Sequence, residues 1–300
     1  MLTRKNPLGL LLRRKAEDAA ASLPSLILAA ERIAAAVLHG DHSRRQSGSG
    51  EKFWQFREYA PGDRPQDIDW RQSGKTDRVF IRQHEWQTNQ NAVLWCSHSP
   101  GMTFHSDNTL PKKAEAGNII TLALAILLTH AGENVSVLGA RRKGRSEAAL
   151  QNVAENLVLG KNTETLPQGG LTRNSALFLC GDFLDPLETI ETNFRSHAAQ
   201  SGGGFVIQIL DPAEIDLPYD GRILFEGMQD KSQELLSSIS PIRAEYRLRI
   251  SEHIDGVKNI SRSCGWHYVL HRTDKDISDT MLEIWTTLSL HTQRAGTRQR

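Results

Sequence analysis

Polar residues that could bind a metal ion or a partner directly follow three short apolar segments of the sequence. Hydroxyl and carboxylate oxygens are the ligands that Mg²⁺ prefers in proteins, and loops from neighbouring strands could bring them together. The alternative is that Asp182 and Asp211 are helix N-caps or turn residues, and spacing alone favours this alternative. The residues and segments are Ser97, His98 and Ser99 after Ala92–Cys96, Asp182 after Ala176–Cys180, and Asp211 after Phe205–Leu210.

A second group of acidic residues lies in the segment Phe53–Glu85, which combines aromatic rings with both signs of charge. Asp63, Asp67 and Asp69 are close enough in sequence to share metal ions, and such carboxylates can support phosphoester hydrolysis. However, charges buried among rings are stable only when they are paired. We therefore favour a structural clasp, in which ion pairs tie an extended arm to the sheet. The partners available in the same segment are Arg57, Arg64, Arg71 and Arg82.

The sequence lacks the common signatures of catalytic and nucleotide-binding sites. No GxGxxG or GxxxxGK[ST] pattern follows an apolar segment, and neither GxSxG nor HExxH occurs. His267 and His271 are four residues apart but on an expected strand, where they would not converge on one ion. The three cysteines, Cys96, Cys180 and Cys264, are widely spaced, which fits a reducing compartment. We predict no catalytic residue and no cofactor, and leave weak Mg²⁺ binding open.

Charge and hydropathy favour a cytoplasmic protein that binds neither nucleic acid nor membranes. The 36 Lys and Arg residues nearly balance 35 Asp and Glu residues, so no strong field attracts a polyanion. Basic residues gather at both ends of the chain, where we expect solvated tails. The apolar run Ile119–Leu128 is shorter than the roughly 20 residues that a membrane span needs. The start, Met1–Leu12, does not have the pattern of a signal peptide.

From residue 91 onward, short apolar segments alternate with longer helical ones. Strands separated by helices form right-handed crossovers and a mostly parallel sheet. The pattern predicts a doubly wound α/β domain over residues 91–292, with ligands at the carboxyl ends of its strands. The expected strands are Ala92–Cys96, Asn134–Leu138, Ala176–Cys180, Phe205–Leu210, Arg222–Glu226, Tyr246–Ile250 and Trp266–His271. The expected helices are Pro111–His130, Ser146–Leu159, Pro186–Ala199, Ser251–Ser263 and Ile277–Leu290.

Three further segments complete the expected organisation. Residues 1–46 hold a basic segment and an amphipathic helix over Ser25–His39, and residues 293–300 form a basic tail. Residues 47–90 form the clasp, with extended stretches at Phe53–Tyr59 and Arg78–Glu85 on either side of turn residues. The glycines at 202–204 precede a strand and predict a flexible connection from the preceding helix.

The clasp segment follows the pattern FxxFREYxPGDxxxDIDWRxSxKTDRxxIRxxE. This pattern resembles the hallmark of the family called domain of unknown function 58. The segments Asp211–Gly221 and Gly265–Asp274 are also similar to later parts of that family, so the resemblance extends roughly from Ser25 to Leu290. The signature residues are Phe56, Arg57, Glu58, Tyr59, Gly62, Asp63, Asp67, Asp69, Trp70, Arg71, Arg82 and Glu85.

The C-terminal part of this family resembles a von Willebrand factor A domain, which implies a Rossmann-like scaffold with a metal-ion-dependent adhesion site. That site normally uses DxSxS after the first strand, together with a Thr and an Asp from two other loops. An alignment anchored on Met102 places Ser97 at the leading Asp and Ser99 at the first Ser. Gly101 then falls at the second Ser, and Asp182 matches the later carboxylate. The resemblance thus implies a degenerate, vestigial site, and leaves open weak ion binding that a partner's carboxylate would complete.

Members of this family are frequently encoded beside MoxR-type AAA+ ATPases. The resemblance therefore implies a non-catalytic adaptor that works with such an ATPase in chaperone-like assembly or maturation of other proteins. The alternative is a metal-dependent phosphoester hydrolase that uses Asp63, Asp67 and Asp69, or Asp182 and Asp211. The residues expected to contact a partner are Ser97, His98, Ser99, Met102, Asp182 and Asp211.

Overall fold

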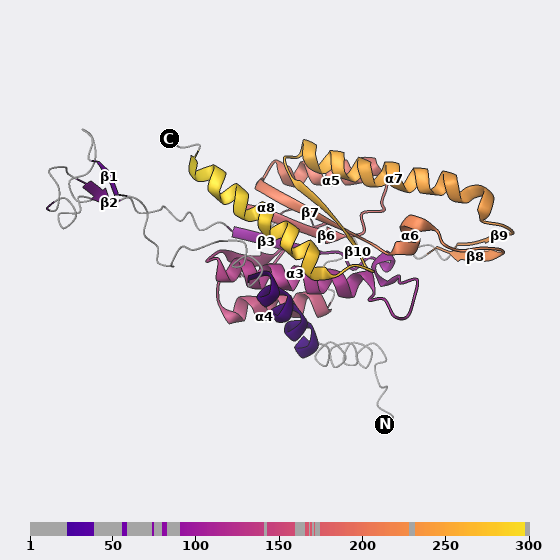
Figure 1. The fold of residues 1–300 in the computed structure, drawn as a ribbon, viewed down its shortest axis with the longest axis horizontal. Helices are drawn as coiled ribbons and strands as arrows, with labels where there is room; N and C mark the ends of the chain where they lie inside the picture. Colours follow the sequence, from indigo (N-terminus) through magenta and orange to yellow (C-terminus); the bar gives the residue numbers. More distant parts are fainter. Residues whose placement is uncertain are drawn as a thin grey trace, which may run out of the picture. The chain divides into compact units, whose positions relative to one another are not determined.

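A computed structural model describes residues 23–38, 56–58, 74, 80–82, 91–140, 143–159, 166–167, 169, 171, 175–227 and 232–297. The chain divides into two compact units, one formed by residues 1–42 and 90–300 and the other by residues 43–89. The larger unit carries a central sheet with helices on both of its faces (Figure 1).

The central sheet has the strand order β10-β7-β6-β3-β4-β5. All neighbours pair in parallel except the short edge strand β5, which is antiparallel to β4. The order runs outward in both directions from β3, the first strand of this sheet along the chain, as in a doubly wound fold. The predicted mostly parallel α/β sheet is therefore confirmed. The strands are β3 Asn91–Cys96, β4 Asn134–Val137, β5 Lys143–Gly144, β6 Ser175–Gly181, β7 Ser201–Leu210 and β10 His267–Arg272.

Two apolar clusters lie on opposite faces of this sheet. One joins α3, α4, α8 and the helix over residues 23–38, and the other joins α5 and α7. Helix α3 is buried along most of its length because its middle is apolar on every side. The helices are α3 Lys113–His130, α4 Glu147–Leu159, α5 Leu187–Ala198, α6 Pro212–Asp216, α7 Ser240–Ser263 and α8 Ile277–Thr297, with a 3₁₀ turn at Pro100–Thr103.

The structure corrects the prediction of a strand at Tyr246–Ile250, because these residues belong to helix α7. The alternation of apolar and basic residues there imitates a strand with one buried face. Leu248, however, is 59% exposed, so the alternation does not mark a buried face. Beside this helix lies an antiparallel hairpin of β8 Ile223–Glu226 and β9 Gln233–Leu236. The first of these strands was predicted and the second was not.

The structure also corrects the prediction of a flexible connection at residues 202–204, because these glycines lie within strand β7. A Cβ atom on Gly204 would lie 2.7 Å from the carbonyl oxygen of Leu177 and 3.2 Å from the Trp266 ring. At position 204, glycine therefore serves close packing between β7, β6 and the residue before β10.

In the smaller unit, the described residues form two short strands, β1 Phe56–Glu58 and β2 Phe80–Arg82, which pair antiparallel. Both lie inside the predicted extended stretches. The predicted clasp contacts and the metal alternative depend on residues outside the described ones, so both stay predictions. These residues are Tyr59, Gly62, Asp63, Asp67, Asp69, Trp70, Arg71 and Glu85.

Across the described ranges, every helix is either too short or too polar to cross a membrane.

Candidate functional site

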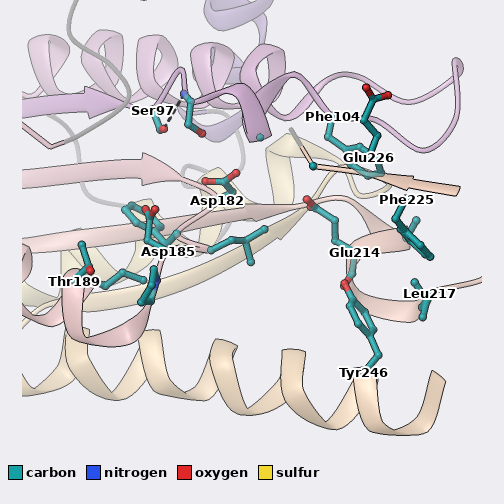
Figure 2. A pocket seen from close by; sticks show the side chains of 18 of the residues that line it. Ser97, Phe104, Asp182, Asp185, Thr189, Glu214, Leu217, Phe225, Glu226 and Tyr246 are labelled. Carbon is teal, nitrogen blue, oxygen red and sulfur yellow. Dashed lines mark hydrogen bonds between the residues drawn. The ribbon is translucent and has the colours of Figure 1, made fainter. Parts of the chain in front are cut away.

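A pocket of about 960 Å³ opens at the carboxyl ends of β3 and β6. These two strands lie side by side where the strand order reverses, the place where doubly wound sheets bind ligands. Loops after the two strands form one wall, and α6, the β8 strand and Tyr246 of α7 form the other (Figure 2). Ser97, Ser99 and Asp182 all line the pocket, so three predicted site residues come together there.

The loop after β3 is held against the neighbouring strand by its backbone. The amide of Ser97 donates to the carbonyl oxygen of Cys180 at 2.8 Å, and the amide of Ser99 donates to the Ser97 hydroxyl at 3.3 Å. Ser99 then begins the 3₁₀ turn, with Pro100 in its first position. Both serines are thereby fixed at the pocket wall.

Lys113 forms the central ion pair of the site. Its side chain is fully buried, and its Nζ lies 3.2 Å from Oδ2 of Asp182 and 2.6 Å from Oε1 of Glu214. A buried ammonium is stable only when carboxylates pair with it. The first residue of α3 therefore links the loop after β6 to helix α6.

Burial raises the pKa of Glu214, although the neighbouring ammonium of Lys113 opposes this rise. Asp185 is exposed at the pocket rim, but partial desolvation by its neighbours and, second, the charge of Asp182 raise its pKa. Burial similarly raises the pKa of Tyr246 to about 12. Burial is the largest cause of all three rises in pKa, so the pocket wall withdraws these groups from water.

The residues present do not fit a divalent cation of the kind that the resemblance implies. Lys113 Nζ already contacts the Asp182 carboxylate that would have to bind the metal. A Cβ atom on Gly101, at the position of the second serine of DxSxS, would lie 2.6 Å from Asp182 Oδ2. Among the described residues, no three His, Cys, Asp or Glu side chains are grouped to hold a metal.

Asp211 has the structural role of an N-cap. Its Oδ1 accepts from the amide of Ala213 and its Oδ2 from the amide of Ser106, at 2.8 and 2.9 Å. Glu214 returns the contact by accepting from the Asp211 amide, which completes a capping box. The N-cap interpretation is confirmed for Asp211, whereas the N-cap position of α5 is Pro186, without a side-chain hydrogen bond, and not Asp182.

Three residues that we expected to contact a partner are used inside the fold. Asp211 and Met102 are 0% exposed, so neither is available at the surface. The ring nitrogens of His98 lie 3.1 Å from the carbonyl oxygen of Cys96 and 2.6 Å from that of Leu157. None of the three lines the pocket.

The site includes several residues that sequence reasoning missed, and Lys113 belongs to it through its ion pairs rather than as a lining residue. Lys113 could have been noticed, because a cation in the first turn of a helix opposes the helix dipole and needs a specific partner. Glu214 carried the capping-box spacing with Asp211. The others gave no sequence signal, because they reach the site through tertiary packing: Phe104, Asp185, Tyr219, Phe225, Glu226 and Tyr246.

The loop after Asp182 is strained and firmly held. Phe183 has φ +48°, in the left-handed region that disfavours a bulky residue. Its carbonyl oxygen lies 2.7 Å from Nε2 of His253, and Gln208 Nε2 donates to the Asp182 carbonyl oxygen at 2.8 Å. Tyr268 in turn donates to Gln208 at 2.6 Å. Buried hydrogen bonds therefore fix the direction in which Asp182 points.

These features define a doubly wound α/β protein with an acidic, ion-paired pocket at the switch in strand order. The chain belongs to the family described as "Protein of unknown function DUF58", whose model matches residues 55–255. Similar proteins include the uncharacterized proteins Mb1516 of Mycobacterium bovis and Rv1480 and MT1527 of Mycobacterium tuberculosis. Each is 23% identical to this chain, and the match covers 86% of this chain and 86% of each relative. No solved structure matches significantly.

Proposed function

We propose that this protein is a non-catalytic adaptor that receives a segment of a partner protein in the pocket. The observation that carries the proposal is the ion pairing of Lys113 with Asp182 and Glu214. The carboxylates of Asp182 and Glu214 are thereby held in a structural ion pair, which leaves them poorly placed to act as catalytic groups. The pocket that remains is large, aromatic and partly apolar, as binding sites usually are.

Exposed apolar side chains at the pocket support a protein partner. Leu184 and Leu224 both line the pocket and are 40% and 54% exposed. Large apolar groups beside a concave surface are typical of interaction sites. A partner segment would cover them and remove them from water.

The partner that we propose is a MoxR-type AAA+ ATPase, and the process is assembly or maturation of other proteins in the cytoplasm. This part of the proposal is supported by the resemblance of the family, including its von Willebrand factor A-like part. The doubly wound strand order and the position of the pocket agree with such a scaffold.

The hydrolase alternative gains no support from the described residues. Asp182 is paired with Lys113, and both carboxylate oxygens of Asp211 accept backbone amides. They do not share a position for a metal ion. The alternative is therefore a prediction for Asp63, Asp67 and Asp69 alone, which lie outside the described residues.

Co-purification with the MoxR-type ATPase of the same genome tests the adaptor proposal. We expect the wild-type chain to retain the ATPase and Leu224→Asn to lose it, because a polar side chain weakens apolar contact at the pocket. Leu28→Asn is the matched control, since Leu28 is 53% exposed and lies away from the pocket. A chain that never retains the ATPase, or equal retention by both variants, would contradict the proposal.

A further inference from the structure

All charged side chains among the described lining residues of the pocket are acidic. They are Asp182, Asp185, Glu214 and Glu226, and no Lys, Arg or His is among them. The Lys113 ammonium behind the wall contacts two of these carboxylates. Asp185 and Glu226 have no ion-pair partner among the described residues. A net negative charge therefore faces the pocket.

Ser99 provides a second, independent indication of a ligand. The residue is 8% exposed and lines the pocket. Within the described ranges, its hydroxyl makes no hydrogen bond, although its amide donates to Ser97. Oδ1 of Asp182 is likewise without a hydrogen bond from a described residue, because Lys113 contacts Oδ2. A bound donor group could satisfy both oxygens.

Aromatic rings lie near two of these acidic groups, Glu214 and Glu226. Figure 2 shows Phe104 and Phe225 near Glu226, and Tyr246 beside Glu214, at the end of the pocket opposite Asp185. Ring faces attract cations, and guanidinium groups most often use this contact. A cation in this pocket would meet carboxylates and aromatic side chains together, whereas an anion would meet like charge.

We infer that the pocket binds a basic side chain, an arginine or a lysine, presented by an extended segment of the partner. The partner thus supplies the cation, and its carboxylate is not needed to complete a metal site. Arginine fits best, because its planar guanidinium can stack on a ring while donating to carboxylates. The inference rests on the proposed adaptor function, and it specifies the chemistry of the segment that docks.

Titration of the full chain with matched short peptides tests the inference. The three probes are alanine-based pentapeptides with a central arginine, citrulline or glutamate, and binding is followed by calorimetry at low salt. We expect saturable binding of the arginine peptide and no measurable binding of the other two. Added salt should weaken this binding, because partly exposed charges are screened.

The double variant Asp185→Asn/Glu226→Gln should weaken arginine-peptide binding by about tenfold. Both side chains are exposed and make no described hydrogen bond, so the variant should fold. Asp279→Asn, an exposed aspartate in the first turn of α8, is the control and should bind as the wild type does. Thermal unfolding of each variant confirms folding.

Three outcomes would overturn the inference: equal binding of the citrulline peptide, preferred binding of the glutamate peptide, or no binding of the arginine peptide. Its failure is distinguishable from failure of the adaptor proposal. If the ATPase is retained through Leu224 while the arginine peptide does not bind, the adaptor stands and the inference fails. If the arginine peptide binds and no ATPase is retained, the pocket binds a basic side chain and the adaptor proposal fails.

Discussion

Lys113 and His271 are both buried polar side chains, but their surroundings offset the free-energy cost of burial in different ways. Lys113 has two carboxylates within 3.2 Å. His271 has one partner, the Thr280 hydroxyl at 2.8 Å from Nδ1, and its Nε2 has none among the described residues. Burial lowers the pKa of His271 to about 4, so the ring is neutral. Lys113 is thus a buried group whose charge is paired, whereas His271 is a buried group that carries no charge.

The largest effect that we expect comes from breaking the paired site. Lys113→Met leaves Asp182 and Glu214 without their ammonium, and removing one partner of a buried pair typically costs about 3–5 kcal/mol. Urea unfolding should show this loss. A loss below about 1 kcal/mol would mean that the carboxylates do not depend on Lys113.

The next largest expected effect is a loss of stability at low pH, caused by protonation of His271. The folded pKa of about 4 lies below the usual histidine value of 6.5, so the unfolded chain binds the proton more readily. Stability from this group is complete above pH 6.5 and is lost as pH falls from 6.5 towards 4. The maximum loss is about 3 kcal/mol.

Unfolding of wild type and His271→Gln at several pH values isolates this contribution. The difference in unfolding free energy between the two should narrow as pH falls through that window. The carboxylates titrate in both proteins, so their contribution to the unfolding free energy cancels in this difference. A difference that does not change with pH would show that His271 titrates normally.

A smaller effect should follow from crowding the paired site at Gly101. A Cβ atom there would lie 2.6 Å from Asp182 Oδ2, and such overpacking costs about 1–3 kcal/mol. Gly101→Ala should therefore lower the midpoint of urea unfolding. Gly132→Ala is unsuitable as a control, because alanine would be strained at the φ of +88° that Gly132 adopts. Gly144→Ala is a better control, since its nearest contact would be 3.5 Å. Equal loss in both variants would contradict the close approach.

The smallest effect should come from an exposed ion pair, which sharpens the contrast with Lys113. Arg195 and Glu191 pair across one turn of α5 with side chains 65% and 42% exposed. Such pairs are worth about 0.3–0.5 kcal/mol, so Arg195→Ala should change stability little. A loss comparable to that of Lys113→Met would show that burial does not decide the difference.

Periodicity was sufficient to predict the central sheet, because apolar strands and helices alternate clearly from residue 91. It failed at Tyr246–Ile250, where alternating exposed residues imitate a strand, and at residues 202–204, where the glycines lie inside strand β7. It also missed β9, whose residues are mostly exposed and carry little apolar signal.

For the site, Ser97, Ser99 and Asp182 could be predicted because carboxyl ends of adjacent parallel strands meet at one edge. Lys113 and Glu214 could not be paired in advance, since they lie 101 residues apart in the sequence. The aromatic wall depends on the course of α7 and on the β8–β9 hairpin, and both required the tertiary structure.

Amide hydrogen exchange of the chain with and without the bound ATPase tests the central claim most directly, because it locates the interface without any mutation. We predict slower exchange in peptides that cover residues 97–101, 182–190 and 223–226, which surround the pocket. Unchanged exchange in these peptides, with protection confined to the helix over residues 23–38 or to α4, would contradict the account.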